Sequence, residues 1–185
     1  MSALTLQLQR RRDRLGLKGP RAAEWLVVQG IVVPMAANSW THTTDLSAND
    51  ALLVARLGTT EFFLEEGTGG TMLKQIAPSL NSHLPGVYPV LREDWAFQLT
   101  GERANEVLAQ VCNVNFAALA GDSQPLVMTL MIGVAVLVVP QGVGSDAVGR
   151  HYRIWCDPTF GPYLGESLGA VVVECGGRYT GDDVR

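Results

Sequence analysis

A chain of 185 residues and 19.9 kDa has room for one domain, or for one duplicated domain. Hydrophobic residues make up 47% and charged residues 17%, with a mean hydropathy of +0.15, which excludes a disordered chain. The charged fraction is below the ~25% typical of soluble domains. We therefore expect an exposed apolar surface, lying mostly on one face, that meets a partner.

The charge is unevenly distributed along the chain. A net charge of -4 and a pI near 5.3 argue against a nucleic-acid-binding protein. Residues 1–21 nevertheless hold six of the 14 basic residues and one acidic residue, a net charge of +5, which leaves -9 on the remainder. We interpret residues 1–13 as a basic N-terminal arm that either docks on a negative neighbour or is simply solvated.

Three cysteines without a Cys-x-x-Cys pair indicate neither a disulfide framework nor a zinc site, and they fit a reducing compartment. No export signal is seen at the N-terminus, so we expect a cytoplasmic protein. The longest apolar stretch, residues 126–140, is shorter than the about 20 residues that a membrane helix needs. It predicts one buried strand, or two short strands with a turn near Gly133.

The first half of the chain predicts five elements in order. A strand at residues 15–18 leads to a helix that starts at Pro20 and stops at Gly30. A loop containing Trp40 follows. Residues 51–58 and 60–66 then alternate like the strands of a hairpin, and a short helix ends near Pro78.

The second half repeats this order. It predicts a strand at residues 95–101, a helix from residue 102 to 113, strands near residues 131–140 and 151–156, and a helix at residues 160–169. An offset of 82 residues aligns Gly19 with Gly101, and also Leu26 with Leu108. We therefore expect an α+β fold in which a strand-helix-strand-strand-helix unit occurs twice, unless the two halves are alike by chance.

Few side chains suggest chemistry. The histidines His42, His83 and His151 are scattered, although His42 lies near Asp45 in sequence. Capping or surface roles therefore fit them better than metal ligation. The glycines of GTGG, residues 67–70, stand where a phosphate loop would lie, but the motif is incomplete and Glu65 and Glu66 would repel a phosphate.

The remaining polar and aromatic candidates point to structural roles. Glu93 and Asp94 are adjacent, so on a strand they would face opposite ways and could not act as an acid-base pair. A solvated turn or the end of a strand is the favoured interpretation of this segment. Arg92 beside them could form an ion pair or hold an anion. The four tryptophans fit core or interface anchoring, and they are Trp25, Trp40, Trp95 and Trp155. We predict no catalytic residue and no metal ligand, and leave cofactor contacts unassigned.

Several stretches carry a family resemblance. They are RLGLKGPRAAEWL (residues 14–26), ALLVARLGTTEFFLEE (residues 51–66), LREDWAFQLTGERANEVLAQVCNVNF (residues 91–116) and YRIWCDPTFGPYLGESL (residues 152–168). They resemble the gamma subunit of heterotetrameric sarcosine oxidase, which is similar to the folate-binding domain of the aminomethyltransferase (glycine cleavage T protein) superfamily. The match covers most of residues 14–169.

The resemblance implies an aminomethyltransferase-like folate-binding-domain fold. It also implies one domain at residues 14–169, with intertwined repeats at about 14–85 and 86–169 and a C-terminal tail at 170–185. In that family the complex oxidises an N-methyl amine and passes the one-carbon unit to tetrahydrofolate. FAD, FMN and NAD are then expected on larger flavoprotein subunits, and tetrahydrofolate is the one ligand still open for this chain.

One departure from the family bears on activity. Folate-dependent aminomethyltransferases carry an acidic residue in a first-half strand, but no acid occurs here between Asp50 and Glu61. We therefore expect a small, non-catalytic subunit, which leaves open whether the chain counts as an enzyme. The alternatives are a stand-alone folate-binding or one-carbon-transfer protein, with Arg92 or the N-terminal arginines gripping the folate glutamate tail, and a scaffold that self-associates.

Overall fold

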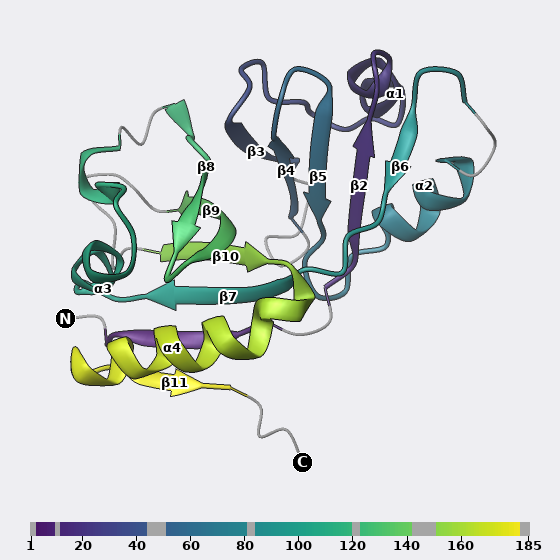
Figure 1. Ribbon diagram of the computed structural model, residues 1–185. Helices are drawn as coiled ribbons and strands as arrows, with labels where there is room; N and C mark the ends of the chain where they lie inside the picture. The colour runs from purple at the N-terminus through teal and green to yellow at the C-terminus, as the bar shows by residue number, and fades with distance from the viewer. Residues whose placement is uncertain are drawn as a thin grey trace. The chain divides into compact units, whose positions relative to one another are not determined.

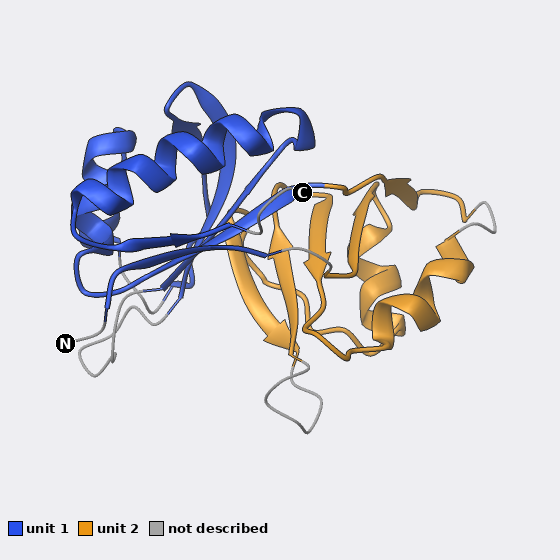
Figure 2. Ribbon diagram, turned by 90° about the horizontal axis from the view of Figure 1, so that it is seen from below, with its two compact units in different colours: residues 1–10, 94–185 blue, residues 11–93 orange. Residues whose placement is uncertain are grey.

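The computed structural model describes residues 3–9, 12–43, 51–80, 84–119, 123–141 and 151–181, which form two β-sheets with flanking helices (Figure 1). The chain divides into two compact units (Figure 2). Unit 1 comprises Met1–Arg10 and Asp94–Arg185, and unit 2 comprises Arg11–Glu93. The short first segment of the chain thus belongs to the same unit as the second half.

Unit 2 contains an antiparallel sheet, sheet B, with the strand order β3-β4-β5-β2-β6. Two helices, α1 and α2, accompany it. In chain order the elements are β2 (Arg14–Lys18), α1 (Ala22–Val28), β3 (Ser39–Thr43), β4 (Leu52–Arg56), β5 (Glu61–Glu65), α2 (Met72–Leu80) and β6 (Tyr88–Val90). Helix α1 connects β2 to β3, helix α2 connects β5 to β6, and the other consecutive strands of unit 2 are connected without a helix among the described residues.

One face of sheet B and both helices form the core of unit 2. Because successive strand residues point to opposite faces, β2 directs Leu17 toward the helices and Gly16 away from them. Leu26 of α1 and Leu73 of α2 pack against the same set of buried strand residues. Burying a leucine contributes about 1.5–3 kcal/mol, so this apolar face holds the unit together.

Unit 1 contains a six-stranded sheet, sheet A, with the strand order β11-β1-β7-β10-β9-β8. All neighbouring pairs are antiparallel except β1 and β11. The elements are β1 (Thr5–Leu8), β7 (Trp95–Thr100), α3 (Ala104–Val111), η1 (Phe116–Ala118), β8 (Val127–Met131), β9 (Val134–Gln141), β10 (His151–Cys156), η3 (Pro158–Phe160), α4 (Gly161–Glu174) and β11 (Arg178–Thr180).

Helices α3 and α4 pack on one face of sheet A. Leu108 of α3 and Leu168 of α4 share a core with Leu6 of β1 and Phe97 of β7. Glycines let α4 approach its neighbours closely, because a Cβ at Gly161 would lie 2.1 Å from the Trp95 ring. The small residues of α4 therefore determine how tightly this helix packs.

The apolar stretch at residues 126–140 forms two strands, β8 and β9, as the second of the two interpretations predicts. Ile132 and Gly133 join them with positive φ values of 50° and 81°. Two consecutive residues with positive φ are typical of the type I′ turn, whose twist matches that of a hairpin. The turn near Gly133 is therefore confirmed.

The helices of unit 2 differ in detail from the sequence interpretation. Arg21 is the N-cap of α1, so the helix begins at Ala22 and not at Pro20. Helix α2 contains Pro78 and continues to Leu80. Gly30, with φ of 80°, follows α1 as expected of a stop.

Several strands were not expected from the sequence. Trp40, placed in a loop, belongs to β3, and Tyr88 belongs to β6. The predicted arm at residues 1–13 contains β1, and the predicted tail at 170–185 contains the end of α4 and all of β11. These strands are three to five residues long. Strands β1, β6 and β11 pair with strands distant in the sequence, whereas β3 pairs with the next strand, β4.

The expected mixed α+β class is confirmed, and the described strands form two sheets. Within the described residues, no helix combines the length and apolar character needed to cross a membrane. The domain boundaries inferred from the repeat stay a prediction.

Candidate functional site

Charged side chains gather on the face of sheet B that points away from α1 and α2. Arg14 of β2 and Glu65 of β5 are cross-strand partners, and the Arg14 Nε donates to Glu65 Oε2 over 2.6 Å. The Glu65 side chain is fully buried. A buried carboxylate requires such a charge-assisted bond, because its desolvation would otherwise be costly.

Arg12 approaches the same carboxylate. Its Nε lies 3.9 Å from Glu65 Oε1. Burial, and secondarily the charge of Arg14, lowers the pKa of the Arg12 guanidinium from its ordinary value. An arginine remains charged at neutral pH despite such a shift, so Glu65 organises two guanidinium groups at the start of β2.

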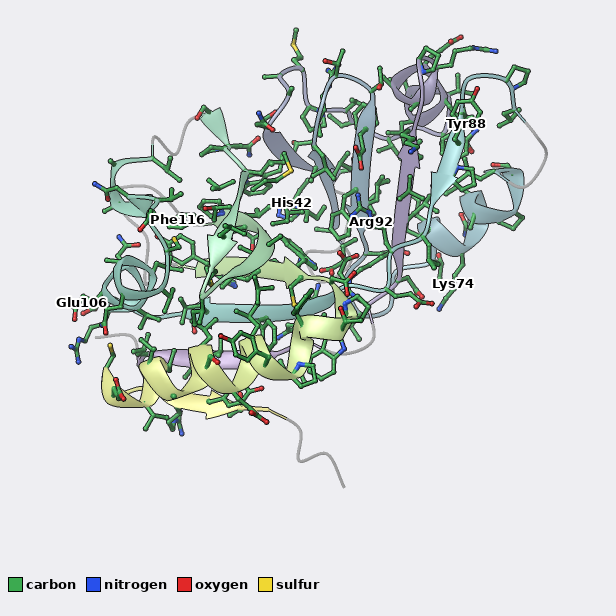
Figure 3. All side chains as sticks on the ribbon, in the orientation of Figure 1. His42, Lys74, Tyr88, Arg92, Glu106 and Phe116 are labelled. Atoms are coloured by element: carbon green, nitrogen blue, oxygen red, sulfur yellow. The ribbon has the colours of Figure 1, made fainter. Side chains whose placement is uncertain are left out.

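Arg92 lies on this same face, where Figure 3 labels it beside the strands of sheet B. Its Nη2 donates to Glu61 Oε1 over 3.1 Å, and its guanidinium carbon lies 5.6 Å from the centre of the Phe63 ring. The side chain crosses over Gly16, where a Cβ would lie 2.8 Å from the Arg92 Cγ. Arg92 therefore forms the ion pair that was one of its two predicted roles.

These contacts bear on the folate-tail hypothesis. Arg14 and Arg92 each hold a carboxylate of their own unit, and Arg21 holds Glu24 at 3.0 Å. Each of these guanidinium groups is thus already engaged by a glutamate of its own unit. Arg10 and Arg11 lie outside the described residues, so the hypothesis cannot be placed on them.

The GTGG segment does not leave a helix end open for phosphate. The Glu66 carboxylate accepts hydrogen bonds from the backbone N–H of Met72, over 2.7 Å, and of Leu73, over 3.1 Å, at the start of α2. Gly70 permits this approach, because a Cβ there would lie 2.1 Å from the Glu66 Cγ. The protein's own carboxylate thus occupies the position that an anion would take.

Unit 1 carries a cation-aromatic pair that the sequence analysis did not identify. Arg153 and Trp155 alternate on β10 and therefore share a face of sheet A. The Arg153 guanidinium carbon lies 5.1 Å from the centre of the Trp155 ring, and the residue is 6% exposed. The sequence contains a signal for this pair, because an arginine and a tryptophan two residues apart on a predicted strand lie on the same face. The geometry of the pair is typical of structural cation–π contacts.

The two histidines that the structure describes belong to different units. His42 lies on β3 with its ring 5.1 Å from the Trp40 ring in an edge-on arrangement. His151 lies on β10 in unit 1 and contacts Gln98 through its Nε2. His83 and Asp45 fall outside the described residues, so the suggested pairing of His42 with Asp45 stays a prediction.

Glu93 and Asp94 are not on a strand. They lie in the irregular segment between β6 and β7, and the division between the two units falls between them. The argument from opposite faces of one strand therefore does not apply, whereas the favoured interpretation, a turn or the end of a strand, agrees with this irregular segment. No catalytic role for either residue follows from their position.

The three cysteines are free thiols, and Cys156 and Cys175 are buried. Burial, and then the charges of Asp94 and Asp157, raises the pKa of the Cys156 thiol to about 12. A thiol with this pKa is a poor nucleophile at neutral pH. Among the described residues, no three His, Cys, Asp or Glu side chains gather as a metal site would require.

The fold is that of an α+β protein, and the charged residues described above form ion pairs and hydrogen bonds within their own unit. No protein-family model matches the chain, and no curated protein matches it in sequence. Solved structures do match in fold.

One similar structure is a chain of heterotetrameric sarcosine oxidase from Corynebacterium sp. U-96 in complex with pyrrole 2-carboxylate. It has a TM-score of 0.70 and 21% identity over 97% of this chain and 89% of that chain. A second is the glycine cleavage system aminomethyltransferase T from Bartonella henselae. It has a TM-score of 0.67 and 16% identity. The match covers 97% of this chain and 48% of the aminomethyltransferase chain. At these identities the likeness establishes the fold.

Proposed function

We propose that this chain is a small, non-catalytic subunit of a heteromeric, sarcosine-oxidase-like flavoenzyme complex. The complex would oxidatively demethylate an N-methyl amine and pass the one-carbon unit to tetrahydrofolate. The observation that carries the proposal is the fold match over 89% of one chain of a heterotetrameric sarcosine oxidase, against 48% of the aminomethyltransferase. The match covers nearly all of one sarcosine oxidase chain and about half of the aminomethyltransferase chain.

The charged side chains support a subunit without an active site of its own. Glu65 and Glu66, buried and adjacent, are used to hold arginines and to cap α2. Cys156 is held as a neutral thiol. In this proposal FAD, FMN and NAD belong to larger flavoprotein subunits, the complex is cytoplasmic, and this chain binds neither a metal nor a cofactor essential to the reaction.

The proposal includes the duplicated unit. Gly19 and Gly101, 82 residues apart, have φ values of 129° and 123° and stand before α1 and α3. The N-cap arginine that follows each, Arg21 or Arg103, pairs with a glutamate three residues on, at 3.0 Å and 2.8 Å. Matching backbone conformations and matching ion pairs at one offset are improbable by chance.

The strand orders of the two sheets agree with this duplication. Sheet B reads β3-β4-β5-β2-β6, and sheet A reads β8-β9-β10-β7-β1 before β11. In this correspondence β6 of unit 2 matches β1 of unit 1. Strand β1 precedes β2 in the chain but pairs with β7, whereas β6 precedes β7 but pairs with β2. The repeats are thus intertwined by exchange of their first strands.

Recovery of the chain from its native host tests the subunit proposal. We expect an affinity-tagged chain to co-purify with larger polypeptides and with the absorbance of bound flavin, and the pooled material to oxidise sarcosine or a related N-methyl amine. Recovery of the tagged chain alone, at native expression and low salt, would contradict the proposal.

A stand-alone folate-binding or one-carbon-transfer protein is the alternative, because the fold also matches an aminomethyltransferase. Titration of the isolated chain with tetrahydrofolate, followed by tryptophan fluorescence, distinguishes the two. We expect no saturable change up to millimolar ligand. A saturable change that Arg92→Gln abolishes, and that the exposed-residue control Val173→Lys retains, would favour the alternative.

A further inference from the structure

Among the described residues, β8 is the last strand at one edge of sheet A. Within the described residues it pairs with β9 alone, and Figure 1 shows β9 beside it as its neighbour in the sheet. Met131 and Val134 close a two-residue turn and therefore exchange hydrogen bonds with each other. Alternation along the antiparallel ladder then directs the backbone N–H and C=O of Met128 and Leu130 toward the open edge.

The side chains on this edge are apolar and exposed. Met128 is 56% exposed and Leu130 is 62% exposed, on the same face of the strand. The strand reads VMTLM, with no charge and no proline. Natural proteins usually protect an edge strand with lysine, proline, a bulge or a covering element, so an uncharged edge of this kind is suited to pairing with another strand.

The strand is complementary to itself. If two copies of β8 lie antiparallel about Thr129, Met128 of each copy faces Leu130 of the other, and the two Thr129 residues face each other. In this register the outward backbone groups of Met128 bond those of Leu130 across the pair. The same patch serves both partners and contains no like charges, as a two-fold interface requires.

We propose that two copies of this chain associate through β8, antiparallel and centred on Thr129, so that sheet A continues from one copy into the other. This pairing is a property of the chain by itself and does not rest on the subunit function. A heteromeric complex that kept it would contain the chain twice.

Sedimentation of the isolated chain over a range of concentrations tests the pairing. We expect a monomer-dimer equilibrium in the wild type and at least ~10-fold weaker association in Met128→Lys and in Leu130→Glu, because each buries an unpaired charge. Val173→Lys is the matched control, since Val173 is 57% exposed in the same unit but lies on α4. This control should leave the equilibrium unchanged.

Mixing the two charged variants tests the register. In the proposed pairing the side chain introduced by Met128→Lys in one copy faces the side chain introduced by Leu130→Glu in the other, so the mixture should associate more strongly than either variant alone. Circular dichroism of each variant verifies that it is folded. A mixture that stays monomeric while both variants are folded would overturn the register.

A cysteine placed on the two-fold axis gives an independent test. Facing residues in a non-hydrogen-bonded antiparallel pair have Cα atoms about 4.5 Å apart, within the range of a disulfide. Thr129→Cys should therefore form a covalent dimer under mild oxidation faster than Met128→Cys, whose two copies face leucine. Equal rates, a wild type that remains monomeric at all concentrations, or an edge buried only by a different subunit would overturn the proposal.

Discussion

At the scale of single residues, Glu66 shows how one side chain decides the role of a glycine-rich segment. Its carboxylate bonds two backbone N–H groups that would otherwise begin α2 without partners. The preceding neighbour, Glu65, is the last residue of β5 and holds Arg14. Two consecutive acids thus serve two different structures, because the strand ends between them and Glu66 begins the connection to α2.

Removing the Glu66 cap should destabilise the protein. We expect Glu66→Ala to lower the free energy of unfolding by about 1–2 kcal/mol, the usual value of a helix cap, and Glu66→Gln to cost less because its amide oxygen still accepts. Urea denaturation measures both. Glu174→Ala, which removes an exposed glutamate at the end of α4, is the control and should change stability little. Equal behaviour of the three variants would contradict the capping role.

The buried Cys156 thiol should make the stability of the protein depend on pH in the alkaline range. Its pKa in the folded chain is about 12, above the ordinary value of 9.0. Above pH 9 the folded state therefore binds more protons than the unfolded state, and stability falls as pH rises from about 9 toward 12. Chemical denaturation across this range should show a smaller decline for Cys156→Ala than for the wild type. Parallel declines would show that other groups cause the loss.

At the scale of elements, α4 shows that glycine can be required inside a helix when neighbouring side chains lie too close for a Cβ atom. Gly165 and Gly169 both face Tyr179 of β11, and Gly161 faces Trp95 of β7. Glycine in a helix interior costs about 1 kcal/mol relative to alanine. The close approach of helix and aromatic side chains is what offsets this cost.

Alanine at Gly165 should destabilise the protein although alanine is the better helix former. The new Cβ would lie 2.8 Å from the Tyr179 Oη and 3.0 Å from a Phe97 ring carbon. Overpacking of this kind costs about 1–3 kcal/mol, which outweighs the gain in helix propensity. In a Tyr179→Phe background, which lacks the hydroxyl, the loss should be smaller.

A control separates this clash from a general effect of removing glycine. A Cβ added at Gly58 would have no heavy atom within 4 Å, so Gly58→Ala should shift the thermal midpoint little. A Gly165→Ala protein as stable as wild type in thermal denaturation would show that α4 moves away without cost.

At the scale of the whole molecule, the first residues of the chain complete a unit made mostly of its second half. Leu4, Leu6 and Leu8 belong to the unit 1 core, and β1 lies between β7 and β11. Unit 2 is a continuous segment that contains all the strands of sheet B. The two units therefore depend differently on chain continuity.

Separating the chain tests this dependence. We expect a fragment of residues 11–93 to fold by itself with reduced stability, and a fragment of residues 94–185 to remain largely unfolded. Each missing leucine removes about 1.5–3 kcal/mol of burial. A peptide of residues 1–10 should restore the circular dichroism of the second fragment, whereas the same peptide with Leu6→Asp should not. A stable fold of residues 94–185 without peptide would contradict the role of β1.

The expected apolar face is a further feature of the whole molecule. The exposed large apolar residues of the described chain come from several elements in both units, among them α1, β6, β8 and α4. A single face covered by larger subunits therefore stays a prediction. On β8, two exposed apolar side chains, Met128 and Leu130, lie on the same face of one strand.

Local patterns were sufficient where a segment's own residues decide its conformation. The two strands β4 and β5, the helix α3, the helix stop at Gly30 and the turn near Gly133 could all be predicted from the sequence. The mixed α+β class followed from their order. Each of these features depends on hydrogen bonds or steric limits within a few residues.

Tertiary structure alone decided three short strands and the contacts of the charged side chains. Strands β1, β6 and β11 are short, and what makes them strands is a partner distant in the chain, as when Thr5 pairs with Thr100. The same holds for the site: Arg14 with Glu65, and Arg92 over Gly16 and Phe63, are contacts across a sheet. Charge and burial determine what these groups do, and both depend on neighbours that only the folded chain brings together.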